Sequence, residues 1–335
     1  MTRPAPGHGA AATRRLLLGT ALAAGAGAMI RPARAAEYPD RPIRLVVPYS
    51  PGGLTDTTAR LTGEAIGAAL GQTVVVENRP GSNSILGAGT VANSPPDGYT
   101  LVMVIGAHAA NATLYAGRLP FDPIASFAPI SHVVTTPLVL AGSRHIPPTT
   151  LRELLDYAKA RPGQVNYGSS GVGSAAHLAM EDLMRRTGVQ MEHVPYRGTQ
   201  PALQDLLAGR LGCMFDVYSS FGPHLEANTI RGLGVASTER PPFARGIPTI
   251  IEGGVPDFEA SAWCLLLAPA RTPPAIVERL SAAVAGMRRD PAMVARLDGL
   301  GLTPVGSTPD EAARFLRAEI DRWGAVIRAA KVQVE

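Results

Sequence analysis

Short apolar runs alternate with helix-spaced apolar positions along most of the chain. Several runs are apolar at nearly every position, as strands covered on both faces by helices are. The predicted strands are Arg44–Tyr49, Thr73–Asn78, Tyr99–Ile105, Val133–Ala141, Gln164–Ser169, Gln190–Tyr196, Leu211–Val217, Ile230–Ala236 and Ala262–Ala268. Helical stripes lie between them, and Thr150 with Glu153 and Thr308 with Glu311 predict capped helix starts. This alternation predicts an α/β fold with open, mostly parallel sheets.

The order of these elements indicates two domains, which suits a chain of 335 residues. Strand–helix units restart after Pro137–Pro148, and the run Ala262–Pro269 is followed by two helices and few strands. This order is typical of a chain that returns to its first domain. We predict a first domain of residues 36–137 and 262–335, interrupted by a second domain of residues 138–261.

Residues 1–35 have the features of an export signal. Arg14 and Arg15 precede an apolar run from Leu16 to Ile30, and Ala33–Ala35 offers the small residues at which signal peptidases cut. The paired arginines favour a twin-arginine signal, with a Sec signal as the alternative. We therefore expect cleavage near Ala35 and a mature protein in the bacterial periplasm.

Composition and charge exclude further classes of function. Apolar residues make up 46% of the chain and charged residues 17%, as in a packed globular protein. The formal net charge is +4, but the first 35 residues hold five arginines and no acid, so the rest carries 26 basic and 27 acidic side chains. No basic cluster interleaved with aromatics follows, so nucleic acid is not an expected partner. Cys213 and Cys264 are expected to be two buried thiols, although export permits a disulfide.

A glycine-rich turn, Pro48–Asp56, leads from the first predicted strand into a helix. Glycines let a ligand approach the backbone, and the free amides at a helix N-terminus favour anions. The candidate binding residues of this turn are Tyr49, Gly52, Gly53 and Asp56. An ordinary tight turn is the alternative interpretation.

A second turn of this kind, Tyr167–Ser174, precedes a predicted helix over Ala175–Arg186. Its amides and hydroxyls are again suited to anions. The candidate residues are Ser169, Ser170, Gly173 and Ser174. Gly171–Ala176 also matches the G-x-G-x-x-A pattern of dinucleotide-binding proteins, with Glu192 about 20 residues further on. A nucleotide-dependent oxidoreductase is therefore an alternative, disfavoured by export and by the lack of an N-terminal βαβ fingerprint.

Later loops add weaker candidates. Tyr196 and Arg197 lie in the loop Pro195–Pro201, where Arg197 either clamps a carboxylate or is a solvated charge. Asp216 ends the next strand, where it accepts a hydrogen bond from a ligand or from the other domain, or caps the following helix.

Motifs for catalysis are missing. The chain has no G-x-S-x-G elbow, no Walker motif, no H-E-x-x-H motif and no Cys/His cluster, so we expect no metal site and no cofactor. Ser174 and His177 share one helical turn, which leaves an exported serine hydrolase as a further alternative. No oxyanion hole or orienting acid accompanies them.

Taken together, these segments resemble the receptors of tripartite tricarboxylate transporters, the TctC or Bug family of extracytoplasmic solute-binding proteins. The resemblance runs from about Tyr38 to Ala330. The segments that carry it are Tyr38–Ile43, Val47–Arg60, Val76–Gly81, Pro96–Leu101, Tyr167–His177, Tyr196–Gly209, Phe215–Asp216, and Trp263 with Leu267–Pro269.

The resemblance implies a two-lobed, type II-like periplasmic-binding-protein (Venus-flytrap) fold, each lobe a doubly wound mixed sheet, that closes on a carboxylate-bearing solute without catalysis. It implies that loops from both lobes grip the carboxylate with main-chain amides, small hydroxyls and ordered water. Tyr196, Asp216 and His108 are then secondary candidates for contact. The expected ligand is a small organic carboxylate, and the expected state is a monomer that serves membrane permease subunits or a sensor.

Three positions depart from the family pattern. Ser82-Asn83-Ser84 stands where the family usually has Ala-Gly-Gly. If this turn lines the cleft, polar side chains replace bare backbone and the preferred solute is unusual. Cys264-Leu265 follows Trp263 where a Gly is common, and Arg271 replaces another Gly; these two concern packing or surface.

Overall fold

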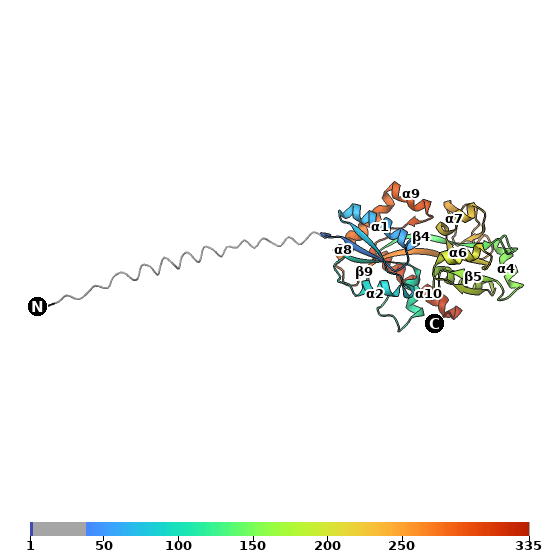
Figure 1. The fold of residues 1–335 in the computed structure, drawn as a ribbon, viewed down its shortest axis with the longest axis horizontal. Coiled ribbons are helices and arrows are strands. Elements are labelled where there is room, and N and C mark those ends of the chain that lie inside the picture. The colour runs from blue at the N-terminus through green and yellow to red at the C-terminus, as the bar shows by residue number, and fades with distance from the viewer. Residues whose placement is uncertain (3–37, 335) are drawn as a thin grey trace. The chain divides into compact units, whose positions relative to one another are not determined.

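One long strand, β4 (Phe127–Ser143), passes through both halves of the sheet in this computed structural model (Figure 1). The structure describes residues 1–2 and 38–334. Residues 41–335 group as one unit, and the described residues before Arg41 belong to a separate unit and form no helix or strand. Apart from its first two residues, the predicted export signal, with its cleavage site near Ala35, lies outside the described residues.

The elements follow one another as strands and helices in alternation. The other strands are β1 (Ile43–Val47), β2 (Val74–Asn78), β3 (Thr100–Val104), β5 (Asn166–Ser169), β6 (Glu192–Pro195), β7 (Cys213–Val217), β8 (Ile230–Val235), β9 (Ser261–Pro269) and β10 (Thr303–Pro304). The α-helices are α1 (Leu54–Leu70), α2 (Ile85–Ala92), α3 (Gly106–Leu114), α4 (Leu151–Lys159), α5 (Ala175–Thr187), α6 (Thr199–Leu207), α7 (Tyr218–Glu226), α8 (Pro274–Gly286), α9 (Pro291–Gly299) and α10 (Pro309–Ala330). Short 3-10 helices are η1 (Ser82–Ser84), η2 (Pro242–Ala244) and η3 (Met287–Arg289).

The sheet has the order β2-β1-β3-β9-β4-β7-β5-β6, and β8 and β10 also pair with β4. Parallel pairs join β1 to β2 and β3, and join β5 to β6 and β7, whereas β4 and β9 run antiparallel to their partners. Within β4, Phe127–Pro137 pairs with β9, and Leu138–Ser143 pairs with β7 and β8. β4 therefore changes partners at Leu138.

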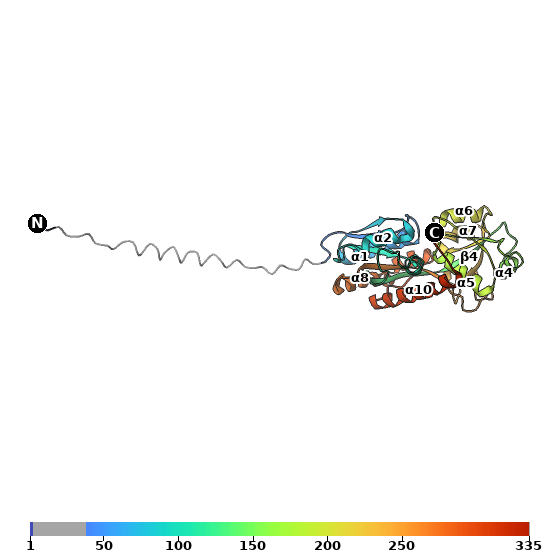
Figure 2. The same ribbon diagram turned by 90° about the horizontal axis from the view of Figure 1, so that it is seen from below.

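This change of partners separates two lobes. We call β1–β3, β9 and β10 with α1–α3 and α8–α10 the first lobe, and β5–β8 with α4–α7 the second lobe; β4 contributes to both. Figure 2 shows α1, α2, α8 and α10 gathered at one end and α4–α7 at the other. The structure is therefore an α/β fold with a mixed sheet, as the family resemblance implies. The prediction of mostly parallel sheets is wrong, because β4 and β9 run antiparallel to all of their partners.

In the first lobe, alternate strand residues point to opposite faces of the sheet. Val46, Val102 and Val104 share one face, where they pack with residues of α2, α3 and α10. Glu319 of α10 is buried beside them, and its Oε2 accepts hydrogen bonds from the indole nitrogens of Trp263 (2.6 Å) and Trp323 (2.8 Å). These donors compensate the desolvation of the carboxylate, so the core tolerates it.

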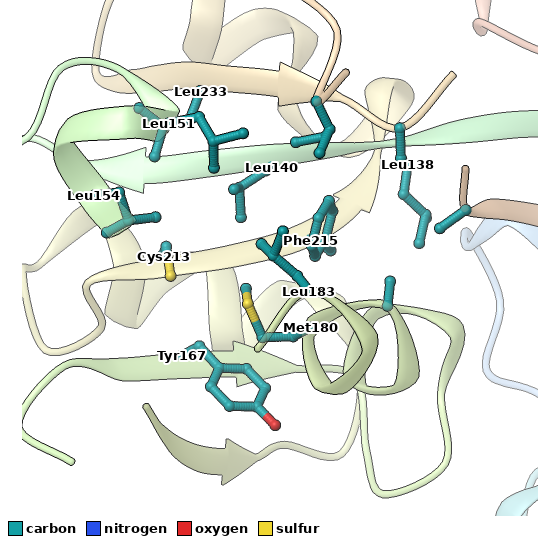
Figure 3. Packing of buried hydrophobic residues seen from close by; sticks show 14 of the residues in the cluster. Leu138, Leu140, Leu151, Leu154, Tyr167, Met180, Leu183, Cys213, Phe215 and Leu233 are labelled. Atoms are coloured by element: carbon teal, nitrogen blue, oxygen red, sulfur yellow. The ribbon is translucent and has the colours of Figure 1, made fainter. Parts of the chain in front are cut away.

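The second lobe follows the same rule (Figure 3). Leu138 and Leu140 of β4 join Phe215 in a core covered by α4 and α5. Val139 and Ala141 point the other way and join residues of α6 and α7. Burying one leucine side chain stabilises the fold by about 2 kcal/mol, so the alternation fixes which side of each strand faces which helices.

All nine predicted strands form. β4 begins at Phe127 rather than at Val133, because two register shifts against β9, at Pro129/Ser131 and His132/Val134, break the apolar alternation there. The capping box of Thr308 and Glu311 forms as predicted. Thr150 also accepts the hydrogen bond from the Glu153 amide, but the Glu153 carboxylate turns to Thr149 instead of completing the box.

Two further features concern the cysteines and the length of the helices. Cys213 and Cys264 are both buried free thiols, which confirms the interpretation as small buried side chains. Among the residues that the structure describes, no helix combines the length and hydropathy needed to cross a membrane.

Candidate functional site

Two strand-to-helix turns combine glycine backbone with helix N-termini. The β1–α1 turn (Pro48–Gly53) and the β5–α5 turn (Ser170–Ser174) each follow the carboxyl end of a strand that pairs in parallel. The backbone φ is +85° at Gly52 and +77° at Gly173, a region in which other residues are strained. Ligands of open α/β sheets bind beyond the carboxyl ends of the strands, so both turns occupy suitable positions.

The β5–α5 turn lies directly against the first lobe. A Cβ atom built on Gly173 would overlap Leu114 of α3 and would lie 3.8 Å from Nδ2 of Asn83. A Cβ atom built on Gly106, at the start of α3, would lie 3.8 Å from the Cβ of Ala175, at the start of α5. The helices α3 and α5 therefore begin beside each other, and the glycines allow this approach.

The β1–α1 turn reaches the same boundary from the first lobe. Leu54, which follows Gly53, packs against the second-lobe cluster that contains Ala176 and Val217. Ala175, which follows the other turn, packs against the same cluster. Gly53 itself is exposed, and nothing lies within 4 Å of a Cβ atom built on it. The structure therefore brings both predicted turns to one boundary between the lobes.

Asp56 holds the β1–α1 turn in shape. Its carboxylate accepts hydrogen bonds from the Gly52 amide (2.9 Å), from Arg60 (2.9 and 3.1 Å) and from Asn78 (2.9 Å). Burial opposes the charge of Asp56, but the hydrogen bonds from Arg60, Gly52 and Asn78 outweigh it and hold its pKa below the ordinary 3.8. Asn78 also donates to the Tyr49 carbonyl (3.0 Å), which ties the turn to β2. Asp56 thus stabilises the conformation of the β1–α1 turn.

Three buried hydroxyls next to this turn make no hydrogen bond of good geometry among the described residues, although Tyr49 and Ser84 lie beside each other and Thr58 lies beside the Cys264 thiol. They are Tyr49 Oη, Thr58 Oγ1 and Ser84 Oγ. Burial raises the pKa of Tyr49, and the neighbouring Ser84 hydroxyl lowers it, so the phenol stays protonated at neutral pH. Buried polar groups are rarely left unpaired, because each costs about 1–3 kcal/mol. The hydroxyls of Tyr49 and Ser84 therefore satisfy each other only in part, which leaves them able to accept a further hydrogen bond beside the β1–α1 turn.

The Ser82–Ser84 turn lies beside both features. Asn83 (φ +50°) and Ser84 (φ +76°) are consecutive non-glycine residues in the left-handed region. The Asn83 side chain donates to Asn111 Oδ1 (2.8 Å), and Asn111 donates back to the Asn83 carbonyl (2.8 Å). Since Asn83 also faces Gly173, this departure from the family pattern lies at the lobe boundary. Asn111 carried no signal in the sequence, because its partner is 28 residues away.

The three predicted serines of the second lobe have different surroundings. Ser169 is fully buried, and its hydroxyl contacts His193 Nε2 (2.7 Å) and the Gly171 carbonyl (3.1 Å). Ser174 caps α5 by accepting a hydrogen bond from the His177 amide (3.2 Å). Ser170 is half-buried, and its hydroxyl shows no hydrogen bond among the described residues, so it is the serine most open to a ligand.

His108 and Tyr196 have internal partners. The His108 ring is buried, contacts the Pro123 carbonyl through Nε2 (2.9 Å) and packs edge-to-face on Phe127 at 5.3 Å. Burial lowers the pKa of His108 to about 4, so the ring is neutral at neutral pH. Tyr196 donates to Asp205 Oδ2 (2.6 Å), and burial together with this carboxylate raises its pKa to about 12. Both side chains therefore make internal contacts in this conformation.

Asp216 and Arg197 differ in exposure. Asp216 is buried and accepts hydrogen bonds from Thr199 (2.6 Å), the Val217 amide (2.7 Å) and Ser220 (3.3 Å). Burial raises the pKa of Asp216 in spite of these three hydrogen bonds. Its carboxylate therefore links residues at the starts of α6 and α7, although the N-cap of α7 is Val217 and has no side-chain cap hydrogen bond. Arg197 is exposed and makes no ion pair among the described residues.

The alternatives from other classes gain no support from the geometry. The Ser174 hydroxyl accepts from a backbone amide, and the His177 ring contacts Gly173 and Glu181 rather than that hydroxyl. No nucleophile–base pair is therefore formed by these two residues. Among the described residues, no group of three or more His, Cys, Asp or Glu side chains is placed to hold a metal ion.

Comparison with known proteins identifies the family of this chain. The family described as "Tripartite tricarboxylate transporter family receptor" matches residues 58–332. The chain belongs to this family. The receptor is 35% identical to Protein BugT of Bordetella pertussis over 302 residues, which cover 89% of the receptor and 91% of BugT.

Solved structures are similar to the receptor over most of its length. One is "R. palustris Rpa4515 with adipate", at 35% identity and a TM-score of 0.83, covering 89% of the receptor and 99% of that chain. Another is MatC from Rhodopseudomonas palustris with bound malate, at 34% identity and a TM-score of 0.78, covering 87% and 100%. The receptor thus has the two-lobed periplasmic-binding-protein fold that the sequence predicts.

Two surface grooves of the receptor lie elsewhere. A groove of about 500 Å³ runs between α4 and residues 253–256, and one of about 670 Å³ runs along α1 and β2. Neither is lined by residues of the β1–α1 or β5–α5 turn. Their walls are largely exposed charged and small side chains, so the turns remain the better candidate site.

Proposed function

We propose that this protein is a periplasmic receptor that captures a small organic carboxylate between the β1–α1 and β5–α5 turns. The observation that carries the proposal is that each turn meets the opposite lobe, with Leu54 after the β1–α1 turn on the second-lobe cluster and Gly173 of the β5–α5 turn against Asn83 and Leu114. The receptor performs no catalysis, needs no cofactor and works as a monomer that delivers its solute to membrane permease subunits.

The turns supply donors suited to a carboxylate. Gly53 caps α1 without a side-chain hydrogen bond, so the first amides of α1 remain free for an anion. The second lobe offers the start of α5 and the Ser170 hydroxyl, and the first lobe adds the hydroxyls of Tyr49 and Ser84. A solute that uses donors from both lobes stabilises the closed form over the open form.

The predicted site residues then divide by role. The proposed contacts are Tyr49, Gly52, Gly53, Ser170, Gly173 and Ser174, with Ser84 added from the structure. The proposed supports, which hold the turns and neighbouring helices, are Asp56, His108, Ser169, Tyr196 and Asp216. The supports have internal side-chain partners, whereas the contacts are the glycines, the hydroxyls of Tyr49, Ser84 and Ser170, and Ser174, which caps α5 at the start of that helix.

The strand pairing supports the proposed domain boundaries. β4 changes partners at Leu138, whose amide donates to the Ala260 carbonyl (2.9 Å) just before β9 begins. The chain therefore crosses between lobes beside residues 137–138 and 260–262. We assign residues 36–137 and 262–335 to the first domain, residues 138–261 to the second, and the hinge to these two crossings.

Diacids are the first solutes to test, because adipate and malate are bound in the similar structures. The experiment is a melting screen of the purified receptor against mono-, di- and tricarboxylates, followed by calorimetry. A solute at about 100 times its Kd should stabilise the receptor by about 2.7 kcal/mol. Absence of stabilisation by every carboxylate, with stabilisation by a neutral or cationic solute, would contradict the proposal.

A further inference from the structure

A buried polar network lies behind the β5–α5 turn. Its members come from β5, α5 and β6 and are Tyr167, Ser169, His177, Glu181 and His193. The rings of His177 and His193 stack face to face, with centroids 3.9 Å apart and planes 8° apart. His177 is 3% exposed, so its contacts are made almost without water. Neither the proposed contacts nor the family description explains this network.

His177 holds the turn through one specific atom. The Gly173 amide donates a hydrogen bond to Nδ1 of His177 (3.0 Å), so Nδ1 acts as an acceptor and carries no proton. The neutral ring then carries its proton on Nε2, which lies 3.6 Å from Glu181 Oε1. Glu181 in turn accepts from the Tyr167 hydroxyl (2.5 Å). The network therefore fixes both the orientation and the tautomer of His177.

The residue held by this bond is the one that meets the first lobe. Gly173 lies against Leu114 and Asn83, and its φ of +77° depends on where its amide points. A proton on Nδ1 of His177 would place two N–H groups against each other and remove the bond. The turn would then lose the support that sets its approach to the first lobe.

Two other ionisable groups of the network, His193 and Glu181, adjoin the His177 ring. Burial and the adjacent His177 lower the pKa of His193 to about 3, against the opposing effect of Glu181. Burial opposes the charge of Glu181, but His177 and Tyr167 outweigh it and lower its pKa, so a carboxylate faces His177. The other titratable groups near the network are Glu192 on β6 and Cys213 on β7. α10 also packs on α5 and makes no hydrogen bond or ion pair with His177 among the described residues.

We propose that His177 is a positioning residue that makes solute affinity depend on pH. The neutral ring holds Gly173 in the geometry that lets the lobes close, and the protonated ring releases it. Affinity is therefore full at pH values where His177 is neutral and falls as the pH drops and the ring takes up a proton. This inference rests on the proposed function, since it concerns the same turn.

The first test needs no solute. Nitrogen-15 NMR of the free protein reports which ring nitrogen of each histidine carries the proton. We expect His177 to show an unprotonated Nδ1 that accepts a hydrogen bond at neutral pH. A His177 ring protonated on Nδ1 at neutral pH would overturn the proposal, whatever the receptor binds.

The second test compares affinities between about pH 8 and about pH 5, the range in which histidines titrate. The probe is malate or adipate, whichever binds the wild type, and its own titration affects every variant equally. We expect the wild type to lose affinity on the order of tenfold over this range. His177→Asn retains an acceptor near Nδ1 and cannot titrate, so it should bind with a much flatter pH profile. His177→Ala should bind weakly at both ends.

The half-buried His224 on α7 provides the matched control, because His224→Asn also replaces one imidazole ring by an amide. That variant should keep the wild-type profile. If His177→Asn kept the wild-type profile as well, the positioning role would be wrong. Failure of the wild type to bind any carboxylate would instead contradict the proposed function, so the two failures are distinguishable.

Discussion

Gly173 and Asn83 come from different lobes, yet a Cβ atom on Gly173 would lie 3.8 Å from the side-chain nitrogen of Asn83. Asn83 cannot yield easily, because it exchanges two hydrogen bonds of 2.8 Å with Asn111. On the other side, Leu114 already fills the space that a side chain on Gly173 would need. The close approach of the lobes at this point therefore depends on the lack of a side chain at Gly173.

Gly173→Ala should lower solute affinity on the order of tenfold, because the added methyl group pushes the lobes apart and penalises the closed form. It should also cost about 1 kcal/mol of stability through its positive φ. Gly188 at the end of α5 has a φ of +70° and nothing within 4 Å of a Cβ atom, so Gly188→Ala carries only the backbone cost. Calorimetry on both variants separates the effects. Equal affinities in the two variants would show that this contact does not limit closure.

Gly53→Val should lower affinity without a comparable loss of stability. Gly53 has an extended backbone with φ −86°, and a Cβ atom there meets nothing within 4 Å, so valine fits the free protein. The side chain would occupy the space over the free amides of α1 that the solute needs.

Gly246→Val is the control for Gly53→Val, because Gly246 also has open space around a Cβ atom and lies outside both turns. Melting temperatures should be similar for the two variants and the wild type. Solute titrations should show weaker binding for Gly53→Val than for Gly246→Val. Unchanged affinity of Gly53→Val would remove the β1–α1 turn from the site.

The strands and both turns could be predicted from the sequence because their signals are local. Apolar runs identify strands such as β1 and β7, and glycines next to a helix start identify the turns. The first residues of β4 were missed, since two irregularities against β9 interrupt the alternation on which the prediction depends.

The sequence did not allow us to predict which side chains already have internal hydrogen-bond partners. Ser169 looked available in the sequence, but His193, 24 residues later, takes its hydroxyl. Asp56 lies in the predicted β1–α1 turn, but its carboxylate oxygens accept hydrogen bonds from Asn78 and Arg60. Such partners depend on which strands become neighbours, and residue spacing along the chain does not reveal it. The sequence pattern therefore predicts where the turns lie, but not which of their polar atoms are available to a ligand.

Asp56→Asn should destabilise the protein by about 2 kcal/mol at neutral pH, because the charge-assisted bonds to Gly52, Arg60 and Asn78 weaken. The pKa of Asp56 lies below its ordinary 3.8 in the folded state, so its stabilisation is fully present above about pH 4. It is lost as the pH falls through the lower, folded-state pKa. Denaturant titrations at neutral and acidic pH should therefore show the variant and the wild type converging in acid.

Glu64→Gln is the matched control on the same helix. Glu64 pairs with Arg296 at 2.6 Å, but both side chains are more than half exposed, so solvent screens this pair and it contributes little to stability. The Asp56 side chain is only 5% exposed. Equal losses of stability in the two variants would contradict the assignment of Asp56 as the support of the β1–α1 turn.

Ser84→Gly should raise stability while lowering solute affinity. Ser84 has a φ of +76°, so glycine relieves about 1 kcal/mol of backbone strain, and it removes a buried hydroxyl whose one polar neighbour is the Tyr49 hydroxyl. Strain of this kind persists where it serves a site, and here the hydroxyl lies beside Tyr49 at the proposed solute position. Thermal unfolding and calorimetry with the best carboxylate measure the two effects.

Asn228→Gly separates strain relief from function. Asn228 follows α7 with a φ of +56°, in the same left-handed region and outside the proposed site, so glycine there should stabilise the fold and leave affinity unchanged. If Ser84→Gly behaved in the same way, with wild-type affinity, its hydroxyl would not contact the solute. If instead affinity fell for Ser84→Gly alone, the gain in stability would exclude partial unfolding as the cause, because a destabilised fold cannot melt at a higher temperature.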